Sequence, residues 1–273
     1  MDTSEVFGAA RPVVGMVHLP ALPGAPRYDR EGGRDRLHAA ARRDAERLAE
    51  GGVDAVMVEN FGDAPFYPDD VPKHVVAELT TLARTVKEAS GLPVGVNVLR
   101  NDGGAAVGAA AAAGADFVRV NVHVGARVTD QGIVEGKAHE TARLRERIDA
   151  DVRLLADVDV KHSAPLASES FEAESLAESA ERGLADGVVV SGARTGRATP
   201  LDTVEDAVER RDALELDTPV FVGSGVTADT VGDLLRVADG VVVGTALKEG
   251  GGTTNPVSVG RVEELVAAAD RVR

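Results

Sequence analysis

The stretch that decides the fold lies near the C-terminal end of the chain: TPVFVGSGVTADTVGDLLRVADGVVVGTALKEGGG, residues 218–252. It contains two apolar runs typical of buried strands, 220–222 and 240–243, and each run ends in a glycine turn. Between the runs, residues 228–237 have the apolar periodicity of an amphipathic helix. Two consecutive strand–turn–helix units at the end of a long chain are typical of the last two units of a (β/α)8 barrel.

The same alternation recurs through the preceding part of the chain. It predicts six further strands, at 12–18, 53–58, 93–98, 116–120, 153–158 and 187–190. It predicts further helices at 34–50, 72–90, 103–113, 138–148, 172–182, 203–214 and 256–272. Because the strands are continuously apolar, as in a parallel sheet covered on both faces, we expect an α/β fold. Residues 1–273 are thus predicted to form one TIM (β/α)8 barrel domain without a linker, with long irregular loops after the fourth and fifth strands, the first of them spanning 123–137.

The composition limits the classes of partner. The chain has 45 acidic and 30 basic residues, a net charge of −15, and no cysteine, so it has no disulfide, thiol nucleophile or cysteine metal site. The acidic surplus disfavours nucleic acid and anionic membranes as partners. No apolar run is long enough for a transmembrane helix and residues 1–11 do not resemble a signal peptide, so we expect a cytoplasmic protein. The acidity, with few lysines, also suggests a halophilic host; a GC-rich genome would explain only the scarcity of lysine.

Polar side chains follow nearly every predicted strand, where a (β/α)8 barrel places its active site. We predict four catalytic residues that supply acid–base or electrostatic chemistry: His18, Glu59, Asp157 and Lys161. Five others are predicted to bind and orient a substrate: Asn60, Asn97, Arg119, Asn121 and His162.

Alternatives stay open for each of these roles. His18 is a general base, a metal ligand or a core histidine, and Glu59 is an acid–base group, a cation ligand or a salt-bridge partner of Arg119. Lys161 is an electrostatic anchor, a Schiff-base amine or a salt-bridge partner. A divalent metal held by His18, Glu59 and Asp157 is also open, although no metal-binding motif supports it.

The turns after the last three strands predict a phosphate site. In this fold the loops after strands seven and eight often bind phosphate, because their glycines let backbone N–H groups approach an anion. The alternative is that the glycines only form tight turns. The predicted phosphate ligands are Ser191, Gly192, Thr195, Gly223, Ser224, Gly225, Gly244 and Thr245. Flavin mononucleotide is a weaker expectation, because aromatic residues are only 3% of the chain.

Several motifs together resemble one known family. MVHLPALPG (16–24), VENFGDAPF (58–66), RVNVHVGARVTDQGIVEGKAHE (119–140), DVDVKHSAPLA (157–167), SGARTG (191–196) and GSGVTADTV (223–231) are similar to the BtpA family over about residues 11–270. The resemblance implies a TIM barrel. It implies either a role in photosystem I biogenesis, from which the family is named, or an enzyme, as is predicted for members in organisms without photosynthesis.

The resulting functional expectation has three forms. The first is an enzyme acting on a small phosphorylated metabolite, such as a sugar phosphate or a nucleotide-like compound, by isomerisation, C–C or C–N cleavage, or hydrolysis. The second is a non-catalytic assembly factor that binds a protein partner. The third is a barrel that binds phosphate without catalysis. A homo-oligomer is compatible with all three.

Overall fold

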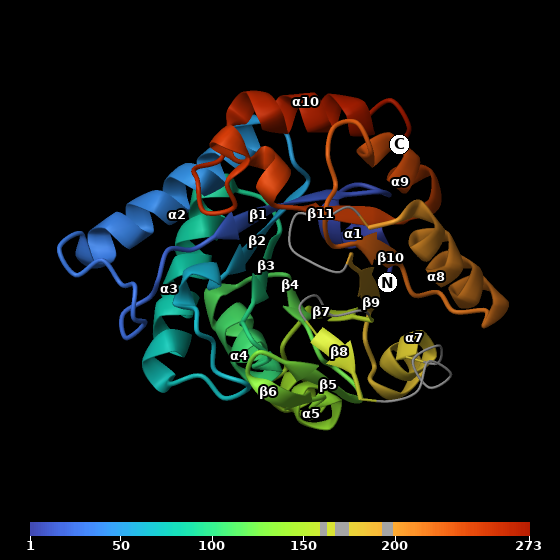
Figure 1. Cartoon of the computed structure of the whole chain (residues 1–273), viewed down its shortest axis with the longest axis horizontal. Helices are drawn as coiled ribbons and strands as arrows, with labels where there is room; N and C mark the ends of the chain where they lie inside the picture. Colours follow the sequence, from blue (N-terminus) through green and yellow to red (C-terminus); the bar gives the residue numbers. More distant parts are fainter. Residues whose placement is uncertain (159–162, 167–174, 193–198) are drawn as a thin grey trace.

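Eight parallel strands close into a barrel in the computed structural model, which describes residues 1–158, 163–166, 175–192 and 199–273 (Figure 1). Neighbours around the barrel follow one another along the chain, in the order β1-β2-β3-β4-β7-β9-β10-β11 and back to β1. This confirms the predicted (β/α)8 fold. The strands are β1 Val13–His18, β2 Ala55–Glu59, β3 Val94–Asn97, β4 Phe117–Val120, β7 Arg153–Asp157, β9 Gly187–Val190, β10 Val220–Val222 and β11 Gly240–Val243.

An outer ring of helices surrounds the strands (Figure 1). Each longer helix turns an apolar stripe towards the sheet; in α2, for example, Leu37, Ala41, Ala45 and Leu48 are buried. The helices are α2 Gly33–Glu50, α3 Lys73–Ser90, α4 Gly103–Ala113, α5 Ala138–Arg147, α7 Ser175–Ala177, continued by the π-helical turn Glu178–Arg182, α8 Leu201–Ala213, α9 Val231–Val237 and α10 Val259–Ala269. No helix in the described ranges is long and apolar enough to cross a membrane.

A short helix missed by the sequence prediction, α1 Thr3–Phe7, closes the N-terminal end of the barrel. Its Phe7 ring packs edge-on against Phe117 and Phe221 inside the barrel, with ring centroids 5.2 and 5.7 Å away. Five residues are too few to show a helical period, so apolar periodicity could not predict this element. Because this end of the barrel interior is filled with apolar side chains, we look for a polar site at the opposite end.

The segment after β4 is not the irregular loop that the sequence predicted. Strands β5 Ala126–Thr129 and β6 Gly132–Glu135 form an antiparallel hairpin, and β8 Ser163–Pro165 pairs with β5. The hairpin turn is Asp130–Gln131, followed by Gly132 at φ 102°. Strands of three or four residues carry too little alternation to be distinguished from a loop, which explains the wrong prediction.

Candidate active site at the barrel mouth

The C-terminal ends of the strands open into a cavity of about 1010 Å³, the scale of a small-molecule site. Loops that follow β1, β2, β3, β10 and β11 form most of its wall. The structure therefore brings together residues that are far apart in the sequence. Nine of the predicted site residues line this cavity: His18, Glu59, Arg119, Asn121, Gly223, Ser224, Gly225, Gly244 and Thr245.

One polar layer sits above the apolar layers of the barrel interior. Strand pairing places His18 opposite Glu59, Glu59 opposite Asn97, and Asn97 opposite Arg119. Side chains alternate along a strand, so residues two positions earlier, such as Met16 of β1, point to the same side and fill the core below. The regular polar ends of the predicted strands were the signal for this layer.

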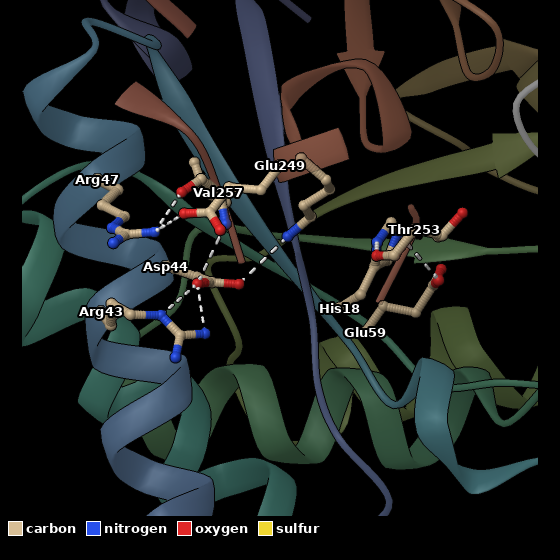
Figure 2. Close-up of polar contacts among 9 residues, drawn as sticks. His18, Arg43, Asp44, Arg47, Glu59, Glu249, Thr253 and Val257 are labelled. Carbon is tan, nitrogen blue, oxygen red and sulfur yellow. Dashed lines mark hydrogen bonds and ion pairs between the residues drawn. The ribbon is translucent and has the colours of Figure 1, made fainter. Parts of the chain in front are cut away.

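His18 and Glu59 form an acid–base pair on the cavity wall. His18 Nε2 lies 3.8 Å from Glu59 Oε1, and His18 Nδ1 lies 3.1 Å from the backbone oxygen of Thr253 (Figure 2). The imidazole also packs against the ring of Phe61, with centroids 4.9 Å apart. Both ionisable side chains are largely buried yet reach the cavity, which is the setting for proton transfer to a bound molecule.

Asp157 is bound to Arg119 beneath the cavity floor. Arg119 donates from Nε to Asp157 Oδ1 at 2.7 Å and from Nη2 to Oδ2 at 2.9 Å, and Asn121 Nδ2 donates to Oδ2 at 2.9 Å. The Asp157 side chain has no exposed surface. Burial acts to lower the pKa of Arg119, but the carboxylates of Asp157 and then Glu59 outweigh it and raise that pKa. This geometry fits a positioning role for Asp157 better than the predicted catalytic role.

Asn60 and Asn97 lie behind the cavity wall. Asn60 exchanges hydrogen bonds with the backbone of Leu99, accepting from N at 2.7 Å and donating to O at 3.3 Å, and thus joins the loops after β2 and β3. Asn97 Nδ2 donates to the backbone oxygen of Arg119 at 2.8 Å, and the side chain is fully buried. The Asn97 Oδ1 atom has no hydrogen-bond partner among the described residues. Substrate contact by either asparagine stays a prediction that this arrangement does not favour.

Three backbone N–H groups in the turn after β10 have no hydrogen-bond partner among the described residues. The N–H groups of Ser224, Gly225 and Val226 make no hydrogen bond within the described part of the chain, and all three residues line the cavity. The Ser224 hydroxyl is used inside the protein, since it accepts from the Gly192 N–H at 2.7 Å. Three consecutive amides of this kind are suited to bind an anion.

Two predicted phosphate glycines have a further reason to be glycine. A Cβ atom on Gly223 would lie 2.6 Å from Ser191 Oγ and 3.1 Å from Arg119 Nη2. On Gly244 it would lie 2.7 Å from His18 Cε1. These glycines therefore make room for polar side chains from neighbouring strands, a reason that the sequence prediction did not contain.

The remaining predicted residues divide into two groups. Ser191 and Gly192 are buried and do not line the cavity, whereas Lys161, His162 and Thr195 lie outside the described residues. The metal set of His18, Glu59 and Asp157 does not form, because Asp157 is bound to Arg119 and Asn121. Among the described residues, no group of three or more His, Asp or Glu side chains could hold a metal ion.

Sequence reasoning missed part of the cavity wall. Arg27, Arg100, Asp130 and Phe66 all line the cavity. Arg100 lies over the Phe66 ring, 5.6 Å from its centroid, and its Nη2 is 3.4 Å from Asp130 Oδ1 at the tip of the β5–β6 hairpin. Arg100 follows the predicted third strand by two residues, so a search for basic residues just past strand ends would have found it.

A protein-family model described as the BtpA family matches residues 9–271. The chain belongs to the BtpA family. An uncharacterized protein of Thermococcus kodakarensis is 47% identical over 263 residues, 96% of this chain and 97% of that one. The photosystem I biogenesis protein BtpA of Synechocystis is 40% identical over 268 residues, 98% of this chain and 91% of that one. An uncharacterized mitochondrial protein of Caenorhabditis elegans is 28% identical, covering 96% and 95% of the two chains.

Solved structures similar to this BtpA-family chain are (β/α)8 barrels. Thiamine phosphate pyrophosphorylase from Pyrococcus furiosus has a TM-score of 0.58 at 15% identity, covering 96% of both chains. Phosphoribosylanthranilate isomerase from the same organism has a TM-score of 0.57 at 17% identity, covering 96% of this chain and all of that one. Mycobacterium tuberculosis tryptophan synthase has a TM-score of 0.60 at 20% identity, covering 97% and 96%. At these identities the similarity shows the fold alone.

Proposed function

We propose that this BtpA-family barrel is an enzyme acting on a small phosphorylated metabolite, a sugar phosphate or a nucleotide-like compound. One observation carries the proposal. The cavity is lined by an acid–base pair, His18 and Glu59, and by Ser224, Gly225 and Val226, whose three consecutive N–H groups have no partner in the part of the chain that the structure describes. Amides of this kind bind phosphate oxygens, and the pair exchanges protons, so both parts of a reaction site face one volume.

The charge of the cavity supports an anionic ligand. Three arginines, Arg27, Arg100 and Arg119, line it, although the whole chain carries a net charge of −15. Arg100 and Arg119 are paired with Asp130 and Asp157, so Arg27 contributes most of the positive charge that an anion would meet. The names of two structurally similar barrels include compounds that contain phosphate, thiamine phosphate and phosphoribosylanthranilate. In this fold, active sites lie at the C-terminal ends of the strands, where the cavity of this chain also lies.

We assign the roles as follows. The N–H groups after β10 and the Thr245 hydroxyl bind the phosphate, and His18 with Glu59 transfers protons. Arg119 and Asn121, held by Asp157, contact the rest of the substrate. Lys161, His162 and Thr195 keep their predicted roles in this proposal. Isomerisation, C–C or C–N cleavage and hydrolysis are the reaction classes compatible with proton transfer beside a phosphate group.

A second candidate is a biogenesis factor that binds a protein partner, supported by the 40% identity to the Synechocystis photosystem I biogenesis protein. The two candidates can be separated in that organism by replacing the relative with this chain or with its Glu59→Gln variant. Equal restoration of photosystem I by both would favour the non-catalytic role. Restoration by the unmodified chain alone would favour chemistry at Glu59.

A thermal-shift screen tests the leading proposal. Pairs of phosphorylated and dephosphorylated metabolites are compared in high salt, because the acidic composition also leads us to propose a salt-adapted, cytoplasmic protein. The Thr245→Asp variant places a carboxylate at the proposed phosphate-binding site. Ser258→Asp adds the same charge at the N-cap of α10, outside the cavity lining. We expect stabilisation by phosphorylated compounds only, lost in Thr245→Asp and kept in Ser258→Asp. Stabilisation by dephosphorylated compounds alone would contradict the proposal.

A further inference from the structure

The backbone oxygen of Thr253 fixes one proton on His18. His18 Nδ1 lies 3.1 Å from this oxygen. A carbonyl oxygen only accepts hydrogen bonds, so the nitrogen facing it must carry the hydrogen. The neutral ring is therefore the Nδ1–H tautomer, and Nε2 is the nitrogen that gains and loses a proton.

The surroundings of Nε2 favour a second proton. Nε2 lies 3.8 Å from Glu59 Oε1, and the two side chains are only 6% and 10% exposed. Among the contacts in the described part of the chain, Nε2 faces the Glu59 carboxylate, so a ring without a further proton would turn a lone pair towards that carboxylate. One additional proton, on Nε2 or on the carboxyl, converts this opposition into attraction. At 3.8 Å the two atoms are not locked in a short hydrogen bond, so the proton can pass to a third group.

The same ring edge lies against the predicted phosphate turn. A Cβ atom placed on Gly244 would be 3.2 Å from His18 Nε2, so this nitrogen packs directly against the backbone of the turn at Gly244. Thr245, the next residue, holds the segment in place through its Oγ1, 3.0 Å from Thr253 Oγ1. His18 Nε2 is therefore next to Gly244 and the neighbouring Thr245, whose hydroxyl is one of the proposed phosphate ligands.

The segment that carries the Thr253 carbonyl is anchored to α2 on its outer side. Lys248 Nζ donates to Asp44 at 3.3 Å. Arg47 donates to Glu249 at 2.8 Å and to the backbone oxygen of Val257 at 2.7 Å (Figure 2). The Lys248–Asp44 pair is buried and the hydrogen bond from Arg47 to Val257 is partly buried, and such charge-assisted contacts limit movement of the segment. The hydrogen bond to His18 Nδ1 is thus a fixed part of the site.

We propose that His18 and Glu59 hold one labile proton, and that His18 Nε2 delivers it to an oxygen or nitrogen of a phosphorylated substrate bound at the Gly244 turn. The Nε2–H bond breaks, an O–H or N–H bond forms on the substrate, and neutral imidazole with its Nδ1–H remains beside the Glu59 carboxylate. This deepens the proposed function and rests on it: the substrate class becomes a phosphorylated compound whose reaction begins with protonation of a heteroatom.

Other charged groups around the cavity affect this pair. Arg119 from β4, Arg27 from the loop after β1, and Arg100 with Asp130 line the same cavity. Glu59 is close enough to Arg119 to raise the pKa of that guanidinium. The charge of Arg119 favours the carboxylate form of Glu59, which leaves Nε2 as the proton carrier.

The test is a pH titration of ¹⁵N-histidine-labelled protein followed by long-range ¹H–¹⁵N NMR. The chain has six histidines, and the His18 signals are assigned by their loss in His18→Gln. Above the titration midpoint we expect the Nδ1–H tautomer. In Glu59→Gln the midpoint of His18 falls by about one pH unit or more. In the matched variant Asp130→Asn, which alters a cavity carboxylate bound to Arg100, it changes much less.

Two results would overturn the proposal: an Nε2–H tautomer in the unmodified protein, or a midpoint that Glu59→Gln leaves in place. The tautomer is read without any substitution, so a variant that fails to fold does not block the test. Inorganic phosphate is then added. A rise in the His18 midpoint supports phosphate beside Nε2. The midpoint of His18 can also stay unchanged while the tautomer and the Glu59→Gln shift are as expected. That result contradicts phosphate binding at Thr245 and proton transfer from Nε2 to the substrate. It does not contradict the proton shared by His18 and Glu59.

Discussion

Arg119 and Asp157 form a two-pronged ion pair at the top of the barrel core, with Nε–Oδ1 and Nη2–Oδ2 distances of 2.7 and 2.9 Å. Both side chains are buried, at 4% and 0% exposure. The polar residues at the strand ends therefore fall into those that reach the cavity and those that hold other side chains in place. His18 and Glu59 reach the cavity, whereas Asp157 supports the side chains that form its floor.

Removing the charge of Asp157 should destabilise the fold. In Asp157→Asn the buried guanidinium of Arg119 loses its counter-ion, and we expect the free energy of unfolding to fall by about 3 kcal/mol. Asp151→Asn is the control, because its carboxylate is 93% exposed and 3.7 Å from Arg153, where an ion pair contributes little. Urea denaturation measures both. Similar small losses in the two variants would show that Asp157 does not anchor Arg119.

Gly244→Ala should disturb the site more than the fold. The new methyl group would lie 2.7 Å from His18 Cε1, so the imidazole must move away from Thr253 and Glu59. We expect at least about tenfold weaker binding of any phosphorylated ligand, since a small misplacement in a site is costly. Gly260→Ala, on the exposed side of α10 with nothing within 4 Å, should leave binding unchanged. Isothermal titration calorimetry compares them, and equal affinities would contradict the packing argument.

The sequence predicted the barrel well because continuously apolar strands and regular helix periods are local signals. It also predicted which strand ends carry polar groups. It could not predict how these groups pair, since Arg119 was expected to bind substrate or Glu59, and its hydrogen bonds go to Asp157. Which side chains pair depends on how far each one reaches across the barrel, and the apolar pattern of the strands carries no information about that distance. For the same reason the sequence did not show that Gly223 and Gly244 accommodate Arg119 and His18.

Removing one partner of the buried Lys248–Asp44 pair should lower the free energy of unfolding, by an amount that depends on which partner is removed. Lys248 is 1% exposed, and its Nζ lies 3.3 Å from Asp44 Oδ2. In Asp44→Asn, we expect a loss of about 3 kcal/mol, because an unpaired ammonium stays buried. Lys248→Met should cost less, since Asp44 keeps its hydrogen bonds from Arg43 at 2.8 and 3.0 Å. Urea unfolding that ranks the two variants in the opposite order would contradict this account.

The pH dependence of the same pair follows from the lysine. Burial lowers the pKa of Lys248, and the attraction of Asp44 only partly opposes this. The unfolded chain therefore binds more protons between the folded and unfolded pKa of this lysine, so stability rises with pH in that window. We expect this alkaline rise in the unmodified protein relative to Lys248→Met. If the free energy of unfolding of the unmodified protein and of Lys248→Met changed with pH in parallel up to about pH 10, the lowered pKa of Lys248 would be ruled out.

His123 should make the protein sensitive to mild acid. Burial lowers its pKa, a hydrogen bond of 2.7 Å to the Gly183 carbonyl opposes the shift, and Arg145 adds to it. The unfolded chain then binds more protons below about pH 6.5, so stability falls as the pH drops from there to the folded pKa. His123→Gln should flatten this decline, whereas His139→Gln, whose side chain is 66% exposed, should not. Thermal denaturation from pH 7 to 5 distinguishes them.

We propose that the turn after β10 and the Thr245 hydroxyl bind a phosphate group in the cavity that His18 and Glu59 also line. A crystal structure with the most stabilising phosphorylated metabolite is the decisive measurement. We expect phosphate oxygens within hydrogen-bond distance of the N–H groups of Ser224, Gly225 and Val226, with the rest of the ligand towards His18 Nε2. A ligand whose phosphate lies instead on Arg27 and Arg100, with these three N–H groups unused, would contradict it.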